Sequence, residues 1–195
     1  MKNSIKAALL AVVSLVLRLM ARLLPHAANV SPVGAIALFA GALFPQGVWA
    51  FFVVLFTLVA GDCVLGFHST TLFVYGSFMG SVLLGRWIFS RSKSNPSVAS
   101  FIGASLLGST LFFLVSNAGV WLCSGLYEHS LSGLGRAYLM AIPFYRGIGM
   151  DQMGGFLGAT VLGDLFYTLI LWTLCWGLGS WEFKKSSENA VLRSN

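Results

Sequence analysis

Charged residues are scarce in this chain. Only 9% of its 195 residues are Asp, Glu, Lys or Arg, whereas 57% are hydrophobic, and the mean hydropathy is +0.83. Soluble domains usually carry about 25% charged residues, so this composition excludes an ordinary water-soluble domain. Lipid tolerates the apolar surface that such a chain exposes. The composition therefore predicts an integral membrane protein.

The sequence also lacks the motifs of common catalytic and nucleotide-binding sites. It contains no GxSxG, no HExxH and no Walker sequence, and His26, His68 and His129 do not stand at metal-ligand spacing. No Lys/Arg cluster suggests a nucleic-acid partner. We therefore expect a protein that is not an enzyme, that holds no cofactor or metal ion, and that does not bind nucleic acid. Active transport would need energy from a partner or an ion gradient.

Cysteine is rare as well. The three cysteines, Cys63, Cys123 and Cys175, form no CxxC pair and show no metal-ligand spacing. Free cysteines of this kind usually behave as small buried hydrophobic residues. Cys63 and Cys123 both fall near the outer ends of predicted spans, so the sequence allows a disulfide between them but does not require one.

Six stretches of the chain are apolar and long enough to cross a bilayer, which takes about 20 residues of helix. The uncharged run between His26 and Asp62 is too long for one crossing, and Pro45-Gln46-Gly47 is a turn signal that divides it. Ser31-Pro32 suits a helix start, with Ser as the cap and Pro at the first helical position. The predicted fold is all-α, a six-helix transmembrane bundle in one domain (1–181) with spans at about 5–24, 30–44, 48–65, 71–90, 98–122 and 157–180.

The distribution of Lys and Arg predicts the orientation of these spans. With both termini inside, the cytoplasmic side carries Lys2, Lys6, Arg86, Arg91, Lys93, Lys184, Lys185 and Arg193, and the outer side only Arg18, Arg22, Arg136 and Arg146. Cytoplasmic loops are enriched in basic residues, so we expect a multi-pass protein of the bacterial inner membrane with the Arg86–Pro96 loop inside. The polar tail 182–195 is expected to be disordered. A cleaved signal sequence is disfavoured, because Arg18 and Arg22 stand where small residues should precede cleavage.

One face of the first span carries small and polar side chains. At 100° per residue, this face gathers Ser4, Ala7, Ala11, Ser14, Arg18, Ala21 and Arg22. Small residues allow close helix contact in lipid, and intramembrane charges usually face protein or water. We therefore expect this face to point at other helices. Snorkelling of Arg18 and Arg22 to the outer headgroups is the alternative.

Two carboxylates lie within the predicted spans. Asp62 closes the third span and Asp164 opens the sixth, so both are expected at a similar depth near the outer side. A carboxylate in hydrocarbon costs several kcal/mol unless it is paired or hydrated. Pairing with Arg18 or Arg22 is therefore expected. Such pairs either brace the bundle or line one polar pocket that is open to the outside.

Further polar and aromatic residues are expected at the same outer layer. The long outer loop, about 123–156, contains a predicted interfacial helix at Leu131–Ile142. Its tyrosines are either interface-belt aromatics or part of a lid over the pocket. The candidate ligand-binding residues of the outer layer are Arg18, Arg22, His26, Asn29, Asp62, His68, Asn117, Trp121, Tyr138 and Asp164.

The motifs along the chain resemble those of a known family. The matching pieces are Arg22–Phe39 (RLLPHAANVSPVGAIALF), Asp62 with Leu65-Gly66 and His68, Val74-Tyr75, Ser116–Trp121 (SNAGVW), Tyr138 with Ala141–Phe144, and Gly163-Asp164. In order, they cover most of residues 18–168. The chain thus resembles an uncharacterised family of bacterial membrane proteins (DUF6580-like), which is similar to the substrate-binding (S) components of energy-coupling factor (ECF) transporters.

This resemblance implies a function and partners. An S component binds a vitamin or another trace nutrient on the outer side, and it works with an ECF coupling protein and two ABC ATPases. Ala7–Ala11 would match the small-xxx-small stretch by which S components contact that partner. No ligand-specific motif is present, so the small-molecule ligand stays unidentified. The alternative is a structural or assembly membrane protein, similar to rod-shape proteins, with no transported ligand.

Overall fold

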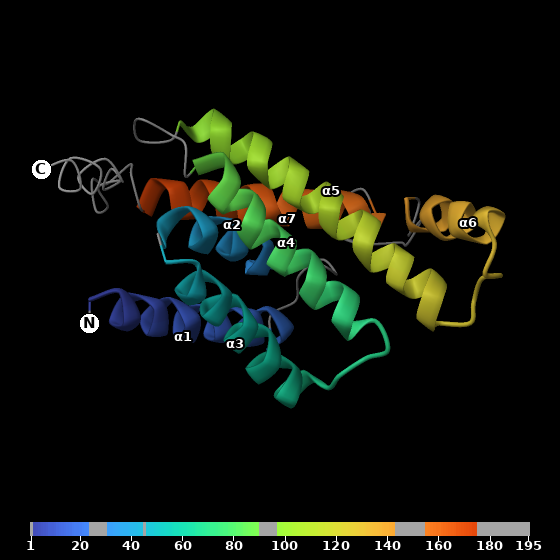
Figure 1. The fold of residues 1–195 in the computed structure, drawn as a ribbon, viewed down its shortest axis with the longest axis horizontal. Coiled ribbons are helices and arrows are strands. Elements are labelled where there is room, and N and C mark those ends of the chain that lie inside the picture. Colours follow the sequence, from blue (N-terminus) through green and yellow to red (C-terminus); the bar gives the residue numbers. More distant parts are fainter. Residues whose placement is uncertain (1, 24–30, 45, 90–96, 143–154, 175–195) are drawn as a thin grey trace, which may run out of the picture.

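The computed structural model describes residues 2–23, 31–44, 46–89, 97–142 and 155–174. Within these ranges the chain forms seven helices and no strand (Figure 1). The predicted all-helical fold is thus confirmed for the described residues. The helices are α1 (Lys2–Leu23), α2 (Val33–Leu43), α3 (Gly47–Leu65), α4 (Thr71–Phe89), α5 (Val98–Cys123), α6 (Leu131–Ala141) and α7 (Gly155–Trp172).

Three of these helices, α3, α4 and α5, are long and apolar enough to cross a membrane. The remaining predicted spans correspond to shorter apolar stretches, Ala7–Met20, Val33–Leu43 and Thr160–Trp172. The predicted interfacial helix is present as α6 and ends one residue earlier than expected. The Arg86–Pro96 loop is described only as far as residue 89, and the tail 182–195 lies outside the described residues.

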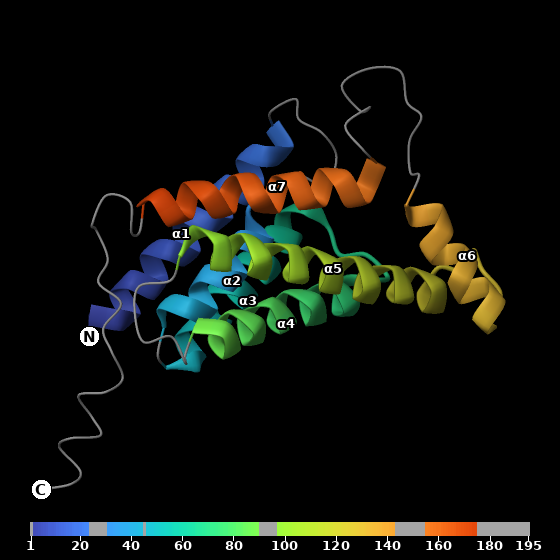
Figure 2. The same ribbon diagram turned by 90° about the horizontal axis from the view of Figure 1, so that it is seen from above.

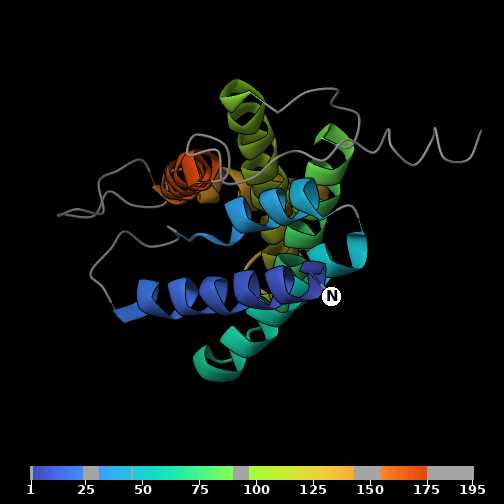
Figure 3. The same cartoon turned by 90° about the vertical axis from the view of Figure 1, so that its left-hand side faces the viewer.

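Helix α2 occupies the centre of the bundle. It packs against α3, α4, α5 and α7, and the end-on view places it between α1 on one side and α5 with α7 on the other (Figure 3). Val33 and every residue from Ala35 to Gly41 are buried. At 1.5 Å per residue its 11 residues extend only about 16 Å, half the thickness of a bilayer core. Because Val33 in its first turn is buried, the N-terminus of α2 lies inside the protein.

Two glycines bring α2 and α4 into backbone contact. A Cβ on Gly41 would overlap the carbonyl oxygen of Val82, and a Cβ on Gly85 would overlap that of Leu38. Small residues allow this close approach, which maximises van der Waals contact between helices in lipid. Next to this crossing, the buried ring of Phe101 on α5 stacks on Phe39 of α2 and on Phe89 of α4. Each of these two ring centroids lies 4.2 Å from that of Phe101. This contact layer fixes α2 against α4 and α5.

Helix α1 packs on α3 through its small-residue face. Ala7, Ala11 and Ser14 are fully buried, and the Thr57 hydroxyl lies 3.5 Å from the Ala11 carbonyl oxygen. The opposite face exposes apolar side chains such as Leu9. The predicted inward orientation of this face is confirmed for the described side chains. Ala7 and Ala11, whose spacing would suit a close helix contact, are buried on the side of α1 that packs on α3.

Helix α6 lies beyond the main bundle, at the end where α5 finishes (Figures 1 and 2). Its N-cap Ser130 accepts a hydrogen bond from the Gly133 amide, which satisfies one of the free amides of the first turn. The Tyr138 hydroxyl donates to the Leu114 carbonyl oxygen at 3.0 Å, so α6 is tied to α5. Helix α6 thus has a defined docking site on the bundle.

Candidate functional site

Two polar groups lie between the helices, each built around one carboxylate. The first joins α1, α3 and α4. Arg18 Nη2 forms a salt bridge with Asp62 Oδ1 at 2.5 Å, and the Tyr75 hydroxyl donates to Asp62 Oδ2 at 2.8 Å. Both carboxylate oxygens are therefore bonded, and Asp62 is only 3% exposed. The predicted pairing of a carboxylate with an arginine is confirmed for Arg18 and Asp62.

Local sequence makes room for this pair. Gly61 precedes the carboxylate, and a Cβ at this position would lie 2.8 Å from Arg18 Nε. Glycine therefore allows the guanidinium to lie flat against α3. Arg18 keeps 16% of its side chain exposed, whereas the Asp62 side chain keeps 4%. The arginine is thus the partner with access to the surroundings.

The second polar group joins α2, α5 and α7. The Ser109 hydroxyl donates to Asp164 Oδ2 at 2.7 Å, and the Asp164 carboxylate also lies against the first turn of α2, where the Ala35 backbone amide faces it. Ala35 lies in the first turn of α2, where backbone amides have no partner within the helix. Asp164 thus caps the buried N-terminus of α2 from another helix. The partial positive charge of that terminus stabilises the carboxylate.

The structure corrects two expectations about Asp164. Asp164 does not open its helix, because α7 begins at Gly155 and places the carboxylate near the middle of the helix, about 13 Å along it. Among the described residues, the two carboxylates are also not bonded into one polar cluster. Within the described residues, Asp62 is bonded from α1 and α4, whereas Asp164 is bonded from α2 and α5. Helix α2 packs on both α3 and α7, so the two groups lie on different helix contacts.

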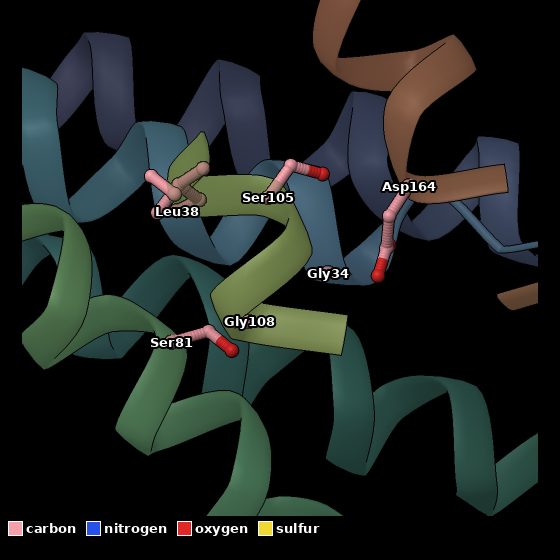
Figure 4. Close-up of a pocket in the computed structure, with 7 residues that line it drawn as sticks. Gly34, Leu38, Ser81, Ser105, Gly108 and Asp164 are labelled. Atoms are coloured by element: carbon pink, nitrogen blue, oxygen red, sulfur yellow. The ribbon is translucent and has the colours of Figure 1, made fainter. Parts of the chain in front are cut away.

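A small cavity adjoins Asp164. It has a volume of about 10 Å³, which suits about one water molecule. Figure 4 shows the side chains of Ser81, Ser105 and Asp164 around it. Ser81 Oγ donates to the Ser77 carbonyl oxygen, and Thr168 Oγ1 donates to Ser105 Oγ at 3.2 Å. The complete lining is Gly34, Leu38, Ser81, Ala104, Ser105, Gly108 and Asp164.

The candidates near the C-terminal end of α5 bond to α5 itself or to the segment that leads to α6. Asn117 Nδ2 donates to the Phe113 carbonyl oxygen of its own helix at 2.8 Å. Trp121 Nε1 donates to the Glu128 carbonyl oxygen at 2.8 Å and so holds the loop that leads to α6. The buried Ser116 hydroxyl, one turn before Val120, has no hydrogen-bond partner in the described part of the chain. None of these hydrogen bonds involves Asp62 or Asp164.

The remaining candidates are exposed or outside the described residues. His68 is exposed, and its Nδ1 lies 2.9 Å from the Thr70 hydroxyl. His26, Asn29 and the side chain of Arg22 lie outside the described residues. Cys63 and Cys123 are free and exposed, so no disulfide joins them. Across the described residues, His, Cys, Asp and Glu form no group of three that could hold a metal ion.

Sequence reasoning missed several of the polar contacts. Tyr75 lies in a matching motif, but the sequence alone does not show that its hydroxyl bonds to Asp62. Ser105 and Ser109 are four residues apart and therefore share one face of α5. Two hydroxyl residues on one face of an apolar helix are a sequence signal for a polar contact. Gly34 has no functional side chain, and only the approach of Asp164 shows why glycine stands there.

These features define an all-helical protein with three helices long enough to cross a membrane and with polar contacts buried between its helices. The chain belongs to a family of unknown function (DUF6580), and the match covers residues 1–186. No curated protein and no solved structure matches the chain.

Proposed function

We propose that this protein is the substrate-binding membrane subunit of a small-molecule uptake system. In this proposal it has six spans with both termini in the cytoplasm of a bacterium, and it resembles ECF S components. The ligand is a vitamin or another trace nutrient that enters from the outer side. An ECF coupling protein and ABC ATPases would supply the energy.

The arrangement of the helix ends supports this topology. The beginning of α1, the end of α4, the beginning of α5 and the end of α7 lie at one end of the bundle (Figures 1 and 2). Most Lys and Arg residues of the chain flank these four helix ends. In a membrane, that end would face the cytoplasm by the positive-inside rule. Helix α6 would then cover the outer end of the bundle.

The observation that carries the proposal is the half-length helix α2 with a carboxylate at its buried N-terminus. Polar groups within a membrane are expensive and usually serve function. Discontinuous helices that end inside the bilayer are typical of transporter binding sites. Here Asp164, Ser109 and the first turn of α2 provide such a polar layer inside an apolar bundle.

In this proposal, the cavity beside Asp164 must open before it can hold the ligand. A vitamin-sized ligand needs a pocket of about 300 Å³ or more, whereas the cavity beside Asp164 has about 10 Å³. Binding would therefore require the helices that line this cavity, α2, α4, α5 and α7, to move apart. In this proposal, the contacts of Trp121 and Tyr138 that dock the outer region on α5 open when the ligand enters.

A structural or assembly role is the second candidate. It is favoured by the contacts of Arg18, Asp62, Trp121 and Tyr138, each of which is bonded to another protein group. A bracing role needs such contacts and no cavity. It predicts that no small molecule raises the thermal stability of the protein.

A thermal-shift screen of vitamins, nucleobases and metal ions on the purified full-length protein tests the proposal. We expect a hit whose stabilisation weakens in Asn117→Ala, Asp62→Asn or Asp164→Asn, with a loss of about 1–3 kcal/mol in binding for Asn117→Ala. Thr110→Ala is the matched control, because Thr110 is exposed on the same helix and also bonds its own backbone. A hit that all three site variants keep would place the site elsewhere, and a screen without any hit would favour the structural role.

A further inference from the structure

Asp164 is a buried carboxylate without a cationic neighbour among the described residues. Its exposure is 6%, and none of the described cations forms a salt bridge with it. The hydrogen bond from Ser109 and the N-terminal turn of α2 are the stabilisation that the described residues show. Neutralisation of this charge would therefore remove a large desolvation cost.

The helices packed around Asp164 carry few other ionisable groups. Helix α2 has none, and α5 has only Cys123 at its last position. On α7 itself, Tyr167 is the sole other ionisable residue. On α4, Tyr75 is bonded to Asp62, and Arg86 at the far end donates to the Phe44 carbonyl oxygen. Asp164 is thus the group at this site that can change charge.

The position of Ser109 suits both protonation states of Asp164. Ser109 Oγ lies 2.7 Å from Asp164 Oδ2 and 3.1 Å from the Ser105 carbonyl oxygen. When Asp164 is ionised, the single hydroxyl hydrogen of Ser109 points to Oδ2. When Asp164 is protonated, its own hydrogen can be donated to Ser109 Oγ, and the Ser109 hydroxyl can turn to the Ser105 carbonyl oxygen. Rotation of one hydroxyl therefore keeps every polar hydrogen bonded.

A water molecule in the cavity beside Asp164 can supply the proton. The cavity adjoins Asp164 and has room for about one water molecule. Ser105, which lines the cavity, accepts a hydrogen bond from the fully buried Thr168 at 3.2 Å. The hydroxyls of Ser109, Ser105 and Thr168 are thus arranged along the contact of α5 with α7, from Asp164 toward the end of the bundle where α7 finishes.

We propose that Asp164 is a proton-binding site that exchanges its proton with water in the adjoining cavity. In uptake, a hydronium ion gives its proton to Oδ2, a water molecule remains, and Ser109 changes from donor to acceptor. Release reverses these steps, so no other reactant is needed. The neutral acid is attracted less strongly to the N-terminus of α2, so the exchange alters how tightly α7 holds α2. This site stands whether or not the protein binds a solute.

Infrared difference spectroscopy of the full-length protein in lipid tests the proposal directly. We expect the C=O stretching band of a buried protonated carboxyl group to grow as the pH falls from about 9 to about 4. The band should be lost in Asp164→Asn and kept in Glu128→Gln, which changes an exposed carboxyl group. A wild-type spectrum without this band, or an unchanged band in Asp164→Asn, would overturn the proposal.

Ser109→Ala tests whether Asp164 carries the proton even if Asp164→Asn does not fold. Loss of the hydroxyl removes the hydrogen-bond acceptor of the protonated acid, so the band should move to higher frequency. Thr110→Ala, the exposed neighbour on the same helix, should leave the band in place. An identical band in Ser109→Ala and the wild type would show that Asp164 does not carry the proton. Because no ligand is used, failure here is distinct from failure of the thermal-shift screen.

Discussion

The carboxylate of Asp164 occupies the space that a side chain on Gly34 would need. A Cβ on Gly34 would overlap Oδ1 of Asp164 and come within 2.9 Å of Oδ2. Gly34 belongs to the first turn of α2 and Asp164 to the middle of α7. The cap of the central helix thus depends on one carboxylate and on the absence of one methyl group.

Gly34→Ala should destabilise the protein by about 1–3 kcal/mol, because the added methyl group displaces the carboxylate from the α2 amides. Thermal unfolding in detergent measures the effect. Gly103→Ala is the matched control, since a Cβ there meets nothing within 4 Å, and it should be neutral or slightly stabilising. Equal unfolding temperatures for Gly34→Ala and the wild type would contradict the proposed cap.

Gly85→Ala should be more harmful than an alanine elsewhere on α4. The methyl group would overlap the Leu38 carbonyl oxygen, a backbone atom that cannot rotate away. Separation of α2 from α4 should cost about 1–3 kcal/mol. Gly76→Ala on the same helix meets nothing within 4 Å and is the control. Thermal unfolding of the two variants should therefore differ clearly, and similar values would show that the helices can move apart freely.

Replacement of one member of the Arg18–Asp62 pair should destabilise the protein more than replacement of both. A single loss leaves an uncompensated charge and typically costs about 3–5 kcal/mol, whereas apolar replacement of both partners can be nearly neutral. Arg18→Leu should cost more than Asp62→Leu, because the long Arg18 side chain can reach headgroups but the short Asp62 side chain cannot.

Unfolding of Arg18→Leu, Asp62→Leu and the double variant gives the coupling energy of the pair. Tyr75→Phe removes only the hydrogen bond to Asp62 and should cost about 1 kcal/mol. If the destabilisation of the double variant equals the sum of the two single effects, the pair does not stabilise the bundle.

The two ends of α5 should lie on opposite sides of the membrane. Cys123 ends this helix and is exposed, whereas Ala99 lies in its first turn and is also exposed. In intact cells, with Cys63 and Cys175 changed to serine, an impermeant maleimide should label Cys123. With the native cysteines changed to serine, it should label Ala99→Cys only after the membrane is permeabilised. Labelling of Ala99→Cys from outside would invert the proposed topology.

Element positions were largely predictable from the sequence. The predicted spans and the interfacial helix agree with the seven helices to within a few residues over most of their described ends. Apolar run length and the Pro45-Gln46-Gly47 turn are local properties, so they can be read without knowledge of the packing. The buried face of α1 was predictable for the same reason, since helical period alone gathers Ala7, Ala11 and Ser14.

The partners of the two carboxylates could not be predicted from the sequence, because they depend on how the helices pack. The sequence shows that Asp62 and Asp164 are rare charges in apolar helices and predicts that each needs compensation. It does not show that α2 lies between the helices that carry them, because helix order around a bundle depends on long-range packing. Only the tertiary structure shows that Asp62 contacts Arg18 and Tyr75. It also shows that Asp164 contacts Ser109 and the first turn of α2.

By itself, the sequence determined that this protein is helical and apolar, with its few charges placed at helix ends or in need of a partner. These properties follow from composition and from periodicity along a single segment. The tertiary structure decided that the central helix ends inside the bundle and that a distant carboxylate caps it. It also decided that glycines set the approach of α2 to α4 and to α7. Close contacts of this kind depend on where two remote backbones meet, and no local pattern specifies that distance.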